Sequence, residues 1–243
     1  MSVRGARALY EMAASDPLYR DAHYLVADVD LDLRQASAFV PAPLSLAAPA
    51  RAVVFAAWFP ETSFGSVYRE AGVFFHVRHG RTPALFCPWM LVDDDVALIT
   101  GRELLGFPKK LGEIAFRLED GRVEAEVSRR GARLLTMRGA VRDALSAPPP
   151  VLGCQHRNVR TSLGIALPKL VAFAPRETVR EVRHVDLAFS IAGSARDPLD
   201  AMGLGPLRAA RLHRVDLGAG SLPRPVALVS PLWLAGHTLL RAH

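Results

Sequence analysis

Segments of strand length recur along this chain of 243 residues and are separated by turn residues. Residues 52–59 are almost continuously apolar, which is typical of a strand buried on both faces. Further segments that are apolar or alternate between apolar and polar residues are 23–30, 67–78, 84–92, 157–163, 179–192 and 207–217. A chain with this many strand-like segments is predicted to be β-rich.

The clearest local pattern lies in residues 113–129. Two segments of alternating polarity, 113–119 and 122–129, flank Asp120-Gly121. An Asp-Gly pair between alternating segments favours a tight β-hairpin. Residues 133–141 continue the alternation, so we expect a three-stranded antiparallel meander.

Helices are expected at only a few places. Residues 33–40 predict a short helix that ends before Pro41. Three aspartates at 93–95 precede a helix that extends to about Leu105, because carboxylates stabilise a helix N-terminus. Residues 226–240 are apolar but too short and too interrupted for a membrane span, so they predict a core or subunit-interface helix. Residues 1–15 predict a short amphipathic helix.

Composition favours one large domain. Half of the residues are hydrophobic, which is ample for a single large core. The three prolines at 148–150 predict a stiff connection rather than a domain linker. We therefore expect a single domain over residues 1–243.

The net charge of +6 and the pI near 9.9 raise the question of a nucleic-acid partner. The basic residues are scattered among acidic ones, and aromatic residues for base stacking are few. We expect no nucleic-acid partner. A diffuse positive field would instead favour small anionic substrates.

Two cysteines, Cys87 and Cys154, have no Cys-x-x-Cys spacing, which favours a reducing compartment over a disulfide framework. The N-terminal residues lack the apolar segment of a signal peptide, so we expect a cytoplasmic protein with no membrane partner. His76 and His79 would point to opposite faces of a strand, which argues against a metal site. No dinucleotide, phosphate-loop or metalloprotease motif is present, and no cofactor is expected.

Lysine is rare in this chain, and two of its three lysines are adjacent, at Lys109 and Lys110. Arginine stays protonated near neutral pH, whereas a buried lysine can become a neutral amine nucleophile. The residues before the pair are largely apolar, and Gly106 and Pro108 define the backbone path. Burial and a neighbouring cation both lower a lysine pKa. The pair is thus a candidate nucleophilic site, although a solvated turn is the simpler alternative.

Residues 101–104 (Gly-Arg-Glu-Leu) and 108–112 (Pro-Lys-Lys-Leu-Gly) resemble the signature of the acetoacetate decarboxylase family. The resemblance implies that Lys109 forms a Schiff base with the substrate and that Lys110 is its electrostatic neighbour. It also implies a β-rich α+β fold, with an antiparallel, barrel-like sheet and peripheral helices. Members of this family tend to be homo-oligomers, and we expect the same here.

A weaker resemblance covers most of the chain. Residues 68–72 (Tyr-Arg-Glu-Ala-Gly) are similar to the family segment that supplies an active-site glutamate, which makes Glu70 the candidate acidic partner. Phe55 lies near the position of a second family glutamate, and Ala22 near that of a substrate-side arginine. Arg20 is two residues from Ala22, on the same face of a regular strand, and could take that role with a shifted register. We expect Arg20, Phe55 and Phe107 to contact the substrate.

Three functions remain open at this point. The first is decarboxylation of a β-keto acid, either acetoacetate or a bulkier and less polar analogue, through an imine on Lys109. In it Glu70 orients the substrate or carries a proton. The second is another Schiff-base reaction, such as that of an aldolase-dehydratase on a different keto acid. The third is a non-catalytic binding protein on the same scaffold.

Overall fold

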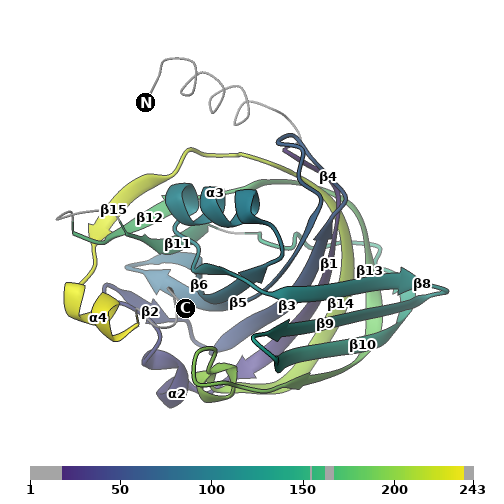
Figure 1. Ribbon diagram of the computed structural model, residues 1–243, viewed down its shortest axis with the longest axis horizontal. Coiled ribbons are helices and arrows are strands. Elements are labelled where there is room, and N and C mark those ends of the chain that lie inside the picture. The colour runs from purple at the N-terminus through teal and green to yellow at the C-terminus, as the bar shows by residue number, and fades with distance from the viewer. Residues whose placement is uncertain (1–17, 154, 162–166, 238–243) are drawn as a thin grey trace.

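The computed structural model of the protein describes residues 18–153, 155–161 and 167–237. Within these residues, fifteen strands form one sheet, with three α-helices and a 3₁₀ helix (Leu199–Met202) beside it (Figure 1). The strands up to the centre of the chain are β1 (Tyr19–Leu31), β2 (Leu44–Leu46), β3 (Arg51–Phe59), β4 (Glu61–Thr62), β5 (Tyr68–His79), β6 (Thr82–Val92), β7 (Lys109–Leu111), β8 (Glu113–Glu119) and β9 (Arg122–Arg129). The others are β10 (Ala132–Ala144), β11 (Gln155–Arg160), β12 (Lys169–Phe173), β13 (Arg176–Ile191), β14 (Leu204–Gly218) and β15 (Arg224–Leu228).

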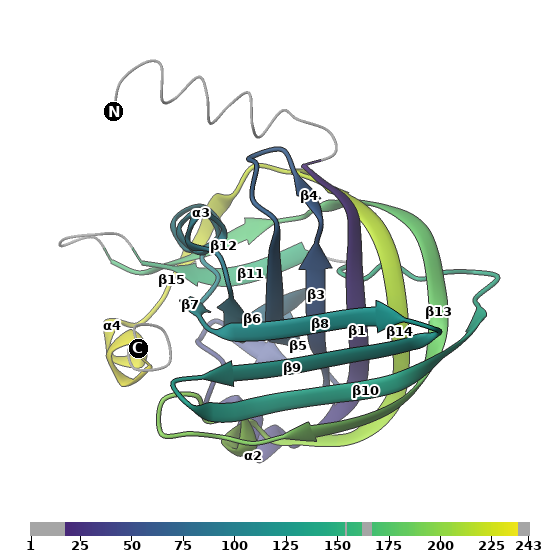
Figure 2. The same cartoon turned by 45° about the vertical axis from the view of Figure 1, so that its right-hand side comes forward.

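The sheet is long and strongly curved. Its strand order is β15-β12-β11-β6-β5-β3-β1-β14-β13-β10-β9-β8, with β2, β4 and β7 attached beside this path. Strands β8, β9 and β10 cross in front of the central strands (Figure 2), and β8 contacts β3 and β5. The described strands β15 and β8, at the two ends of the path, do not pair, so the sheet is open. The predicted β-rich fold is confirmed, and its sheet is antiparallel except where β7 and β11 run parallel to β6.

The two faces of the central strands belong to two different hydrophobic clusters. Along β3, Ala52, Val54 and Ala56 belong to the larger cluster. The intervening residues Val53 and Phe55 belong to the smaller one. This alternation is the period of two expected for a strand buried on both faces. The near-continuous apolar run that the sequence shows here therefore reflects two cores, one on each side of the sheet.

Most sequence predictions for the elements are confirmed. The hairpin of β8 and β9 turns at Asp120-Gly121, and β10 completes the meander. Helix α3 (Asp95–Leu105) is capped by Asp94, whose side chain accepts a hydrogen bond from the Ala97 amide. Helix α2 (Leu33–Ser37) ends before the predicted limit at residue 40.

The C-terminal prediction is wrong in part. Residues 226–240 were expected to form one helix, but β15 pairs with the edge strand β12, and the short helix α4 (Pro231–Gly236) follows. Pro231 begins this helix because a proline at its first turn loses no hydrogen bond. Strand β12 was not anticipated, and the predicted helix at residues 1–15 lies outside the described residues. The single domain over 1–243 stays a prediction.

Candidate active site

A cavity of about 480 Å³ lies on the face of the sheet that carries the smaller cluster. Strands β1, β3, β5 and β11, helix α3 and residues 217–223 contribute to its wall. Its phenylalanines are Phe55, Phe59, Phe64, Phe74, Phe107 and Phe173. Cavities of this size and apolar character commonly bind small organic molecules.

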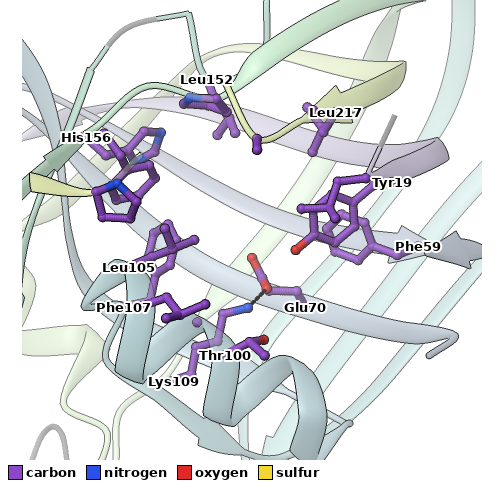
Figure 3. Close-up of a pocket in the computed structure, with 18 of the residues that line it drawn as sticks. Tyr19, Phe59, Glu70, Thr100, Leu105, Phe107, Lys109, Leu152, His156 and Leu217 are labelled. Atoms are coloured by element: carbon purple, nitrogen blue, oxygen red, sulfur yellow. Dashed lines mark hydrogen bonds and ion pairs between the residues drawn. The ribbon is translucent and has the colours of Figure 1, made fainter. Parts of the chain in front are cut away.

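Lys109 and Glu70 form a buried pair in this cavity (Figure 3). The Lys109 Nζ donates a hydrogen bond to Glu70 Oε2 at 2.6 Å, and the residues are 4% and 7% exposed. Lys109 is the first residue of β7 and lies opposite Met90 of the neighbouring strand β6. Glu70, on β5, lies opposite Val92 of β6. Three neighbouring strands therefore fix the pair, and its bond is charge-assisted.

Helix α3 packs directly over the Lys109 side chain. A Cβ atom at Gly101 would lie 2.6 Å from both Cδ and Cε of Lys109, closer than atoms of this kind can approach. The helix ends at Gly106, which adopts the left-handed conformation with φ of 71°. The glycines of the 101–112 motif thus let a helix and a strand close around the amine.

Aromatic rings surround the amine. The Lys109 Nζ lies 5.6 Å from the centre of the Tyr68 ring and 5.7 Å from that of Phe107. Rings at this distance stabilise an ammonium ion. Burial raises the pKa of Tyr19; the charge of Lys109 lowers this pKa and the charge of Glu70 raises it, each by less than burial does. Burial also raises the pKa of Tyr68 well above its usual range, so both phenols stay protonated and can donate hydrogen bonds.

Lys110 points away from this cavity, because successive residues of a strand face opposite sides of the sheet. Its Nζ forms a buried ion pair with Asp197. Asp197 also accepts hydrogen bonds from Arg129 at 3.1 Å and from the indole of Trp89 at 2.9 Å. Burial lowers the pKa of Lys110, with Asp197 opposing that shift. Burial alone would raise the pKa of Asp197, but the hydrogen bonds from Lys110, Trp89 and Arg129 and the charge of Lys110 together outweigh it and lower that pKa.

The structure brings together four of the six predicted site residues. Lys109, Glu70, Phe55 and Phe107 all line the cavity. Lys110 does not line it, so its role as an electrostatic neighbour stays a prediction.

Arg20 lies outside the cavity. It is exposed on β1 and forms an ion pair with Glu61 at 3.1 Å. The pairing of β1 shifts between Tyr19 and Ala22, and Asp21 has a positive φ of 56°. This bulge breaks the alternation on which the prediction for Arg20 depended, and it directs Tyr19 into the cavity instead.

Several cavity residues were missed from the sequence. Tyr68 could have been found, because it lies two residues before Glu70 on one strand and hence on the same face. The sequence allows His156 to line a pocket, although a lone histidine is more often structural, and Arg160 was not considered. Both lie on β11, on the same face of the strand, and both contribute to the wall. Their proximity to Lys109 depends on the pairing of β11 with β6, for which the sequence carries no local signal.

The described part of the chain has no cluster of three or more His, Cys, Asp or Glu residues arranged to hold a metal ion. Within the same residues, no helix combines the length and hydrophobicity needed to cross a membrane.

The fold and the cavity thus define a β-rich protein with a lysine–carboxylate pair in an apolar pocket. The sequence model of the family described as acetoacetate decarboxylase (ADC) matches residues 6–223. The chain belongs to the acetoacetate decarboxylase family.

Curated relatives support this membership. Acetoacetate decarboxylase 1 of Bradyrhizobium diazoefficiens is 32% identical over 120 residues, which cover 46% of this chain and 48% of the relative. Acetoacetate decarboxylase of Acidiphilium cryptum is 31% identical over 96 residues, covering 40% of this chain and 39% of the relative. The chain thus spans at most about half the length of these curated relatives.

Solved structures share the fold. Acetoacetate decarboxylase from Legionella pneumophila aligns with a TM-score of 0.76 at 15% identity, covering 86% of each chain. The enduracididine biosynthesis enzyme MppR complexed with pyruvate aligns with a TM-score of 0.72 at 17% identity, covering 84% of this chain and 88% of that one. An acetoacetate decarboxylase-like enzyme from Sphingomonas wittichii aligns with a TM-score of 0.69 at 20% identity, covering 84% and 91%.

Proposed function

We propose that this protein is a Schiff-base lyase that decarboxylates a β-keto acid through an imine on Lys109. The observation that supports it most is the Lys109 amine, hydrogen-bonded to Glu70 in a cavity lined mainly by apolar and aromatic residues. A primary amine beside a carboxylate can form, use and hydrolyse an imine without a cofactor. Membership in the acetoacetate decarboxylase family supports the same reaction.

Imine formation begins with a proton transfer. The Lys109 ammonium passes a proton to the Glu70 carboxylate along their 2.6 Å hydrogen bond, which leaves a neutral amine. The amine attacks the ketone carbon of the substrate. Glu70 then returns the proton to the departing hydroxyl, so that water leaves and a positively charged iminium remains.

The iminium accepts the electron pair of the bond between the α-carbon and the carboxylate. This bond breaks, carbon dioxide leaves, and the electron pair forms the double bond of a neutral enamine. One proton from solvent, passed by Glu70 or water to the α-carbon, restores the iminium. Addition of water then releases the ketone and the Lys109 amine, so one proton is consumed in each turnover.

The apolar wall supports this step. A carboxylate surrounded by hydrocarbon is poorly solvated, and its charge disappears when carbon dioxide forms. Phe55 is buried in the wall, and Ala22 is buried in the same cluster. These residues lie near the positions where the family resemblance places charged groups, which favours a bulkier and less polar substrate than acetoacetate.

The test is carbon dioxide release from a panel of β-keto acids that ranges from acetoacetate to branched and aromatic 3-oxo acids. We expect release with at least one bulky member and a loss of release in Lys109→Met. A folded wild-type protein that releases carbon dioxide from no member would contradict the decarboxylase assignment.

A second candidate is carbon–carbon bond formation by a Schiff-base aldolase-dehydratase. The cavity volume of about 480 Å³ favours it, because this space exceeds the needs of a four-carbon acid. A protein of the same fold, MppR, has been crystallised with pyruvate. Incubation with pyruvate and an aromatic aldehyde separates the two: a condensation product without carbon dioxide would favour the aldolase-dehydratase.

A further inference from the structure

His156 lies in the cavity wall within a box of aromatic rings. Its imidazole stacks on Phe173 with ring centres 4.9 Å apart and an angle of 10°. The rings of Phe74 and Phe107 stand steeply inclined to it, at 74° and 72°, with ring centres 5.2 and 5.8 Å away. The residue is fully buried, so the histidine is held in place by packing.

Neither ring nitrogen of His156 has a hydrogen-bond partner among the described residues. A buried polar atom without a partner costs free energy, and phenylalanine would fill an aromatic box without that cost. Burial, with a smaller effect from Arg157, lowers the pKa of His156 to about 3. The imidazole is therefore neutral near pH 7 and presents one donor and one acceptor.

Phe107 separates His156 from the reactive amine. The centre of its ring is 5.7 Å from the Lys109 Nζ and 5.8 Å from the centre of the imidazole. Figure 3 shows His156 and Lys109 on the same side of the cavity, with Leu105 and Phe107 between them. A molecule attached to Lys109 can therefore run along an apolar surface and end at His156. Such a molecule needs an arm that extends past the Phe107 ring.

We propose that His156 recognises a hydroxyl group at the far end of the substrate, and that the substrate is a keto acid with a flat apolar arm that ends in this hydroxyl. This proposal rests on the imine chemistry proposed for Lys109. A hydroxyl matches the neutral imidazole because each can donate one hydrogen bond and accept another. The surrounding rings offer the arm stacking and edge contacts. Neither imidazole nitrogen is hydrogen-bonded to the Lys109 amine, and Phe107 lies between the two residues (Figure 3), so we assign His156 to specificity and not to the bond changes.

The proposal can be tested without imine chemistry. The probes are two alcohols that cannot form an imine, 1-(4-hydroxyphenyl)ethanol and 1-phenylethanol, together with the same pair lengthened by two methylene groups. Calorimetric titration of the full chain gives the ratio of their dissociation constants. We expect the hydroxylated member of at least one pair to bind about tenfold more tightly to the wild type. The preference should fall to about one in His156→Phe.

A matched control is His213→Phe. His213 is also buried, and neither of its ring nitrogens has a partner among the described residues, but it does not line the cavity. We expect this variant to keep the preference for the hydroxylated probe. A preference that survives in His156→Phe, or that disappears equally in His213→Phe, would overturn the proposal.

A second measurement covers the case in which His156→Phe does not fold. In wild-type protein labelled with ¹⁵N-histidine, the hydroxylated probe should shift the ring-nitrogen resonances of His156 more than its unsubstituted partner does. Equal shifts for both members of each pair would count against recognition by His156. Because these probes carry no ketone, this test can succeed even if carbon dioxide release fails, and the two proposals are therefore separable.

Discussion

Lys109 and Lys110 are neighbours in the sequence and are almost equally buried, with exposed fractions of 4% and 3%. They nevertheless belong to different regions of the molecule. Lys109 faces a cavity and has Glu70 as its carboxylate partner. Lys110 faces the opposite side of the sheet, where Asp197, Arg129 and Trp89 form a packed polar cluster.

The difference shows that two almost equally buried lysines can differ in their access to a small molecule. The Lys110 amine has carboxylate and backbone carbonyl acceptors, from Asp197 and Arg196, and it does not line the cavity. The Lys109 amine borders an open volume in which a ketone can approach. One residue of offset along a strand separates an amine that lines the cavity from one that pairs with a buried carboxylate on the other side of the sheet.

The largest effect is expected at Glu70, the carboxylate partner of Lys109 in the cavity. Glu70→Gln keeps the shape of the side chain but cannot take a proton from Lys109. We expect kcat to fall by about 10²- to 10³-fold, because general acid–base catalysis typically contributes this much. Steady-state carbon dioxide release measures it. Unchanged turnover in Glu70→Gln would remove Glu70 from the proposed mechanism.

The second prediction concerns Lys110, on the side of the sheet opposite the cavity. Lys110→Met leaves Asp197 buried with Arg129 and Trp89 as its remaining partners. Loss of one member of a buried ion pair is strongly destabilising, and we expect the free energy of unfolding to fall by about 3 kcal/mol. Urea denaturation measures this change. Turnover per folded molecule should stay within about tenfold of wild type, and a complete loss of turnover in folded protein would show that Lys110 acts in catalysis.

Gly101→Ala perturbs the cavity face without removing a polar group. The new Cβ would force the flexible end of Lys109 to move, while alanine suits the helix better than glycine. We expect turnover to fall by about 10- to 100-fold, because small displacements of a reacting group are costly. The melting temperature should change little. Gly236→Ala is the control, because a Cβ there meets no atom within 4 Å.

The pH dependence of stability probes the buried histidines. Burial, together with Arg211, lowers the pKa of His213 to about 4. Below the ordinary histidine pKa of 6.5 the unfolded chain binds a proton that the folded chain excludes, so stability falls as the pH is lowered towards 4. His213 should contribute a slope of about 1.4 kcal/mol per pH unit.

The slope is measured from urea denaturation at about pH 6 and pH 5. His213→Phe should be less sensitive to acid than the wild type by this amount. An identical slope in both proteins would mean that His213 is protonated, or exposed, in the folded state.

The smallest effect is expected at Arg20. Its side chain is half exposed and pairs with Glu61 at the surface. Arg20→Ala should change stability by less than about 0.5 kcal/mol and KM by less than about twofold, because exposed ion pairs contribute little. A large increase in KM would place Arg20 at the substrate after all.

The sequence was informative where the signal is local. Alternation and Asp120-Gly121 predict the hairpin of β8 and β9, three aspartates predict the start of α3, and the resemblance around residues 101–112 identifies Lys109. Glu70 was also found from its local segment. These features depend on neighbouring residues, so a single sequence contains them.

The features that were missed depend on distant parts of the chain. Asp197, the partner of Lys110, is 87 residues away in the sequence. The bulge at Asp21 leaves Tyr19, and not Arg20, in the cavity wall, and no turn motif in the sequence marks this bulge. The sequence raises His156 as a possible pocket residue, but its place in the cavity wall depends on the parallel pairing of β11 with β6. Tertiary pairing decides such positions, and local pattern does not encode it.

The central claim is that Lys109, and not its neighbour, forms a covalent imine with a keto acid. The most direct test is mass spectrometry of the intact protein after incubation with keto acids and borohydride, followed by peptide mapping. We predict one reduced adduct, located on Lys109, whose mass shows whether carbon dioxide left before reduction. An adduct on Lys110 or Lys169, or folded protein that gives no adduct with any keto acid, would contradict the account.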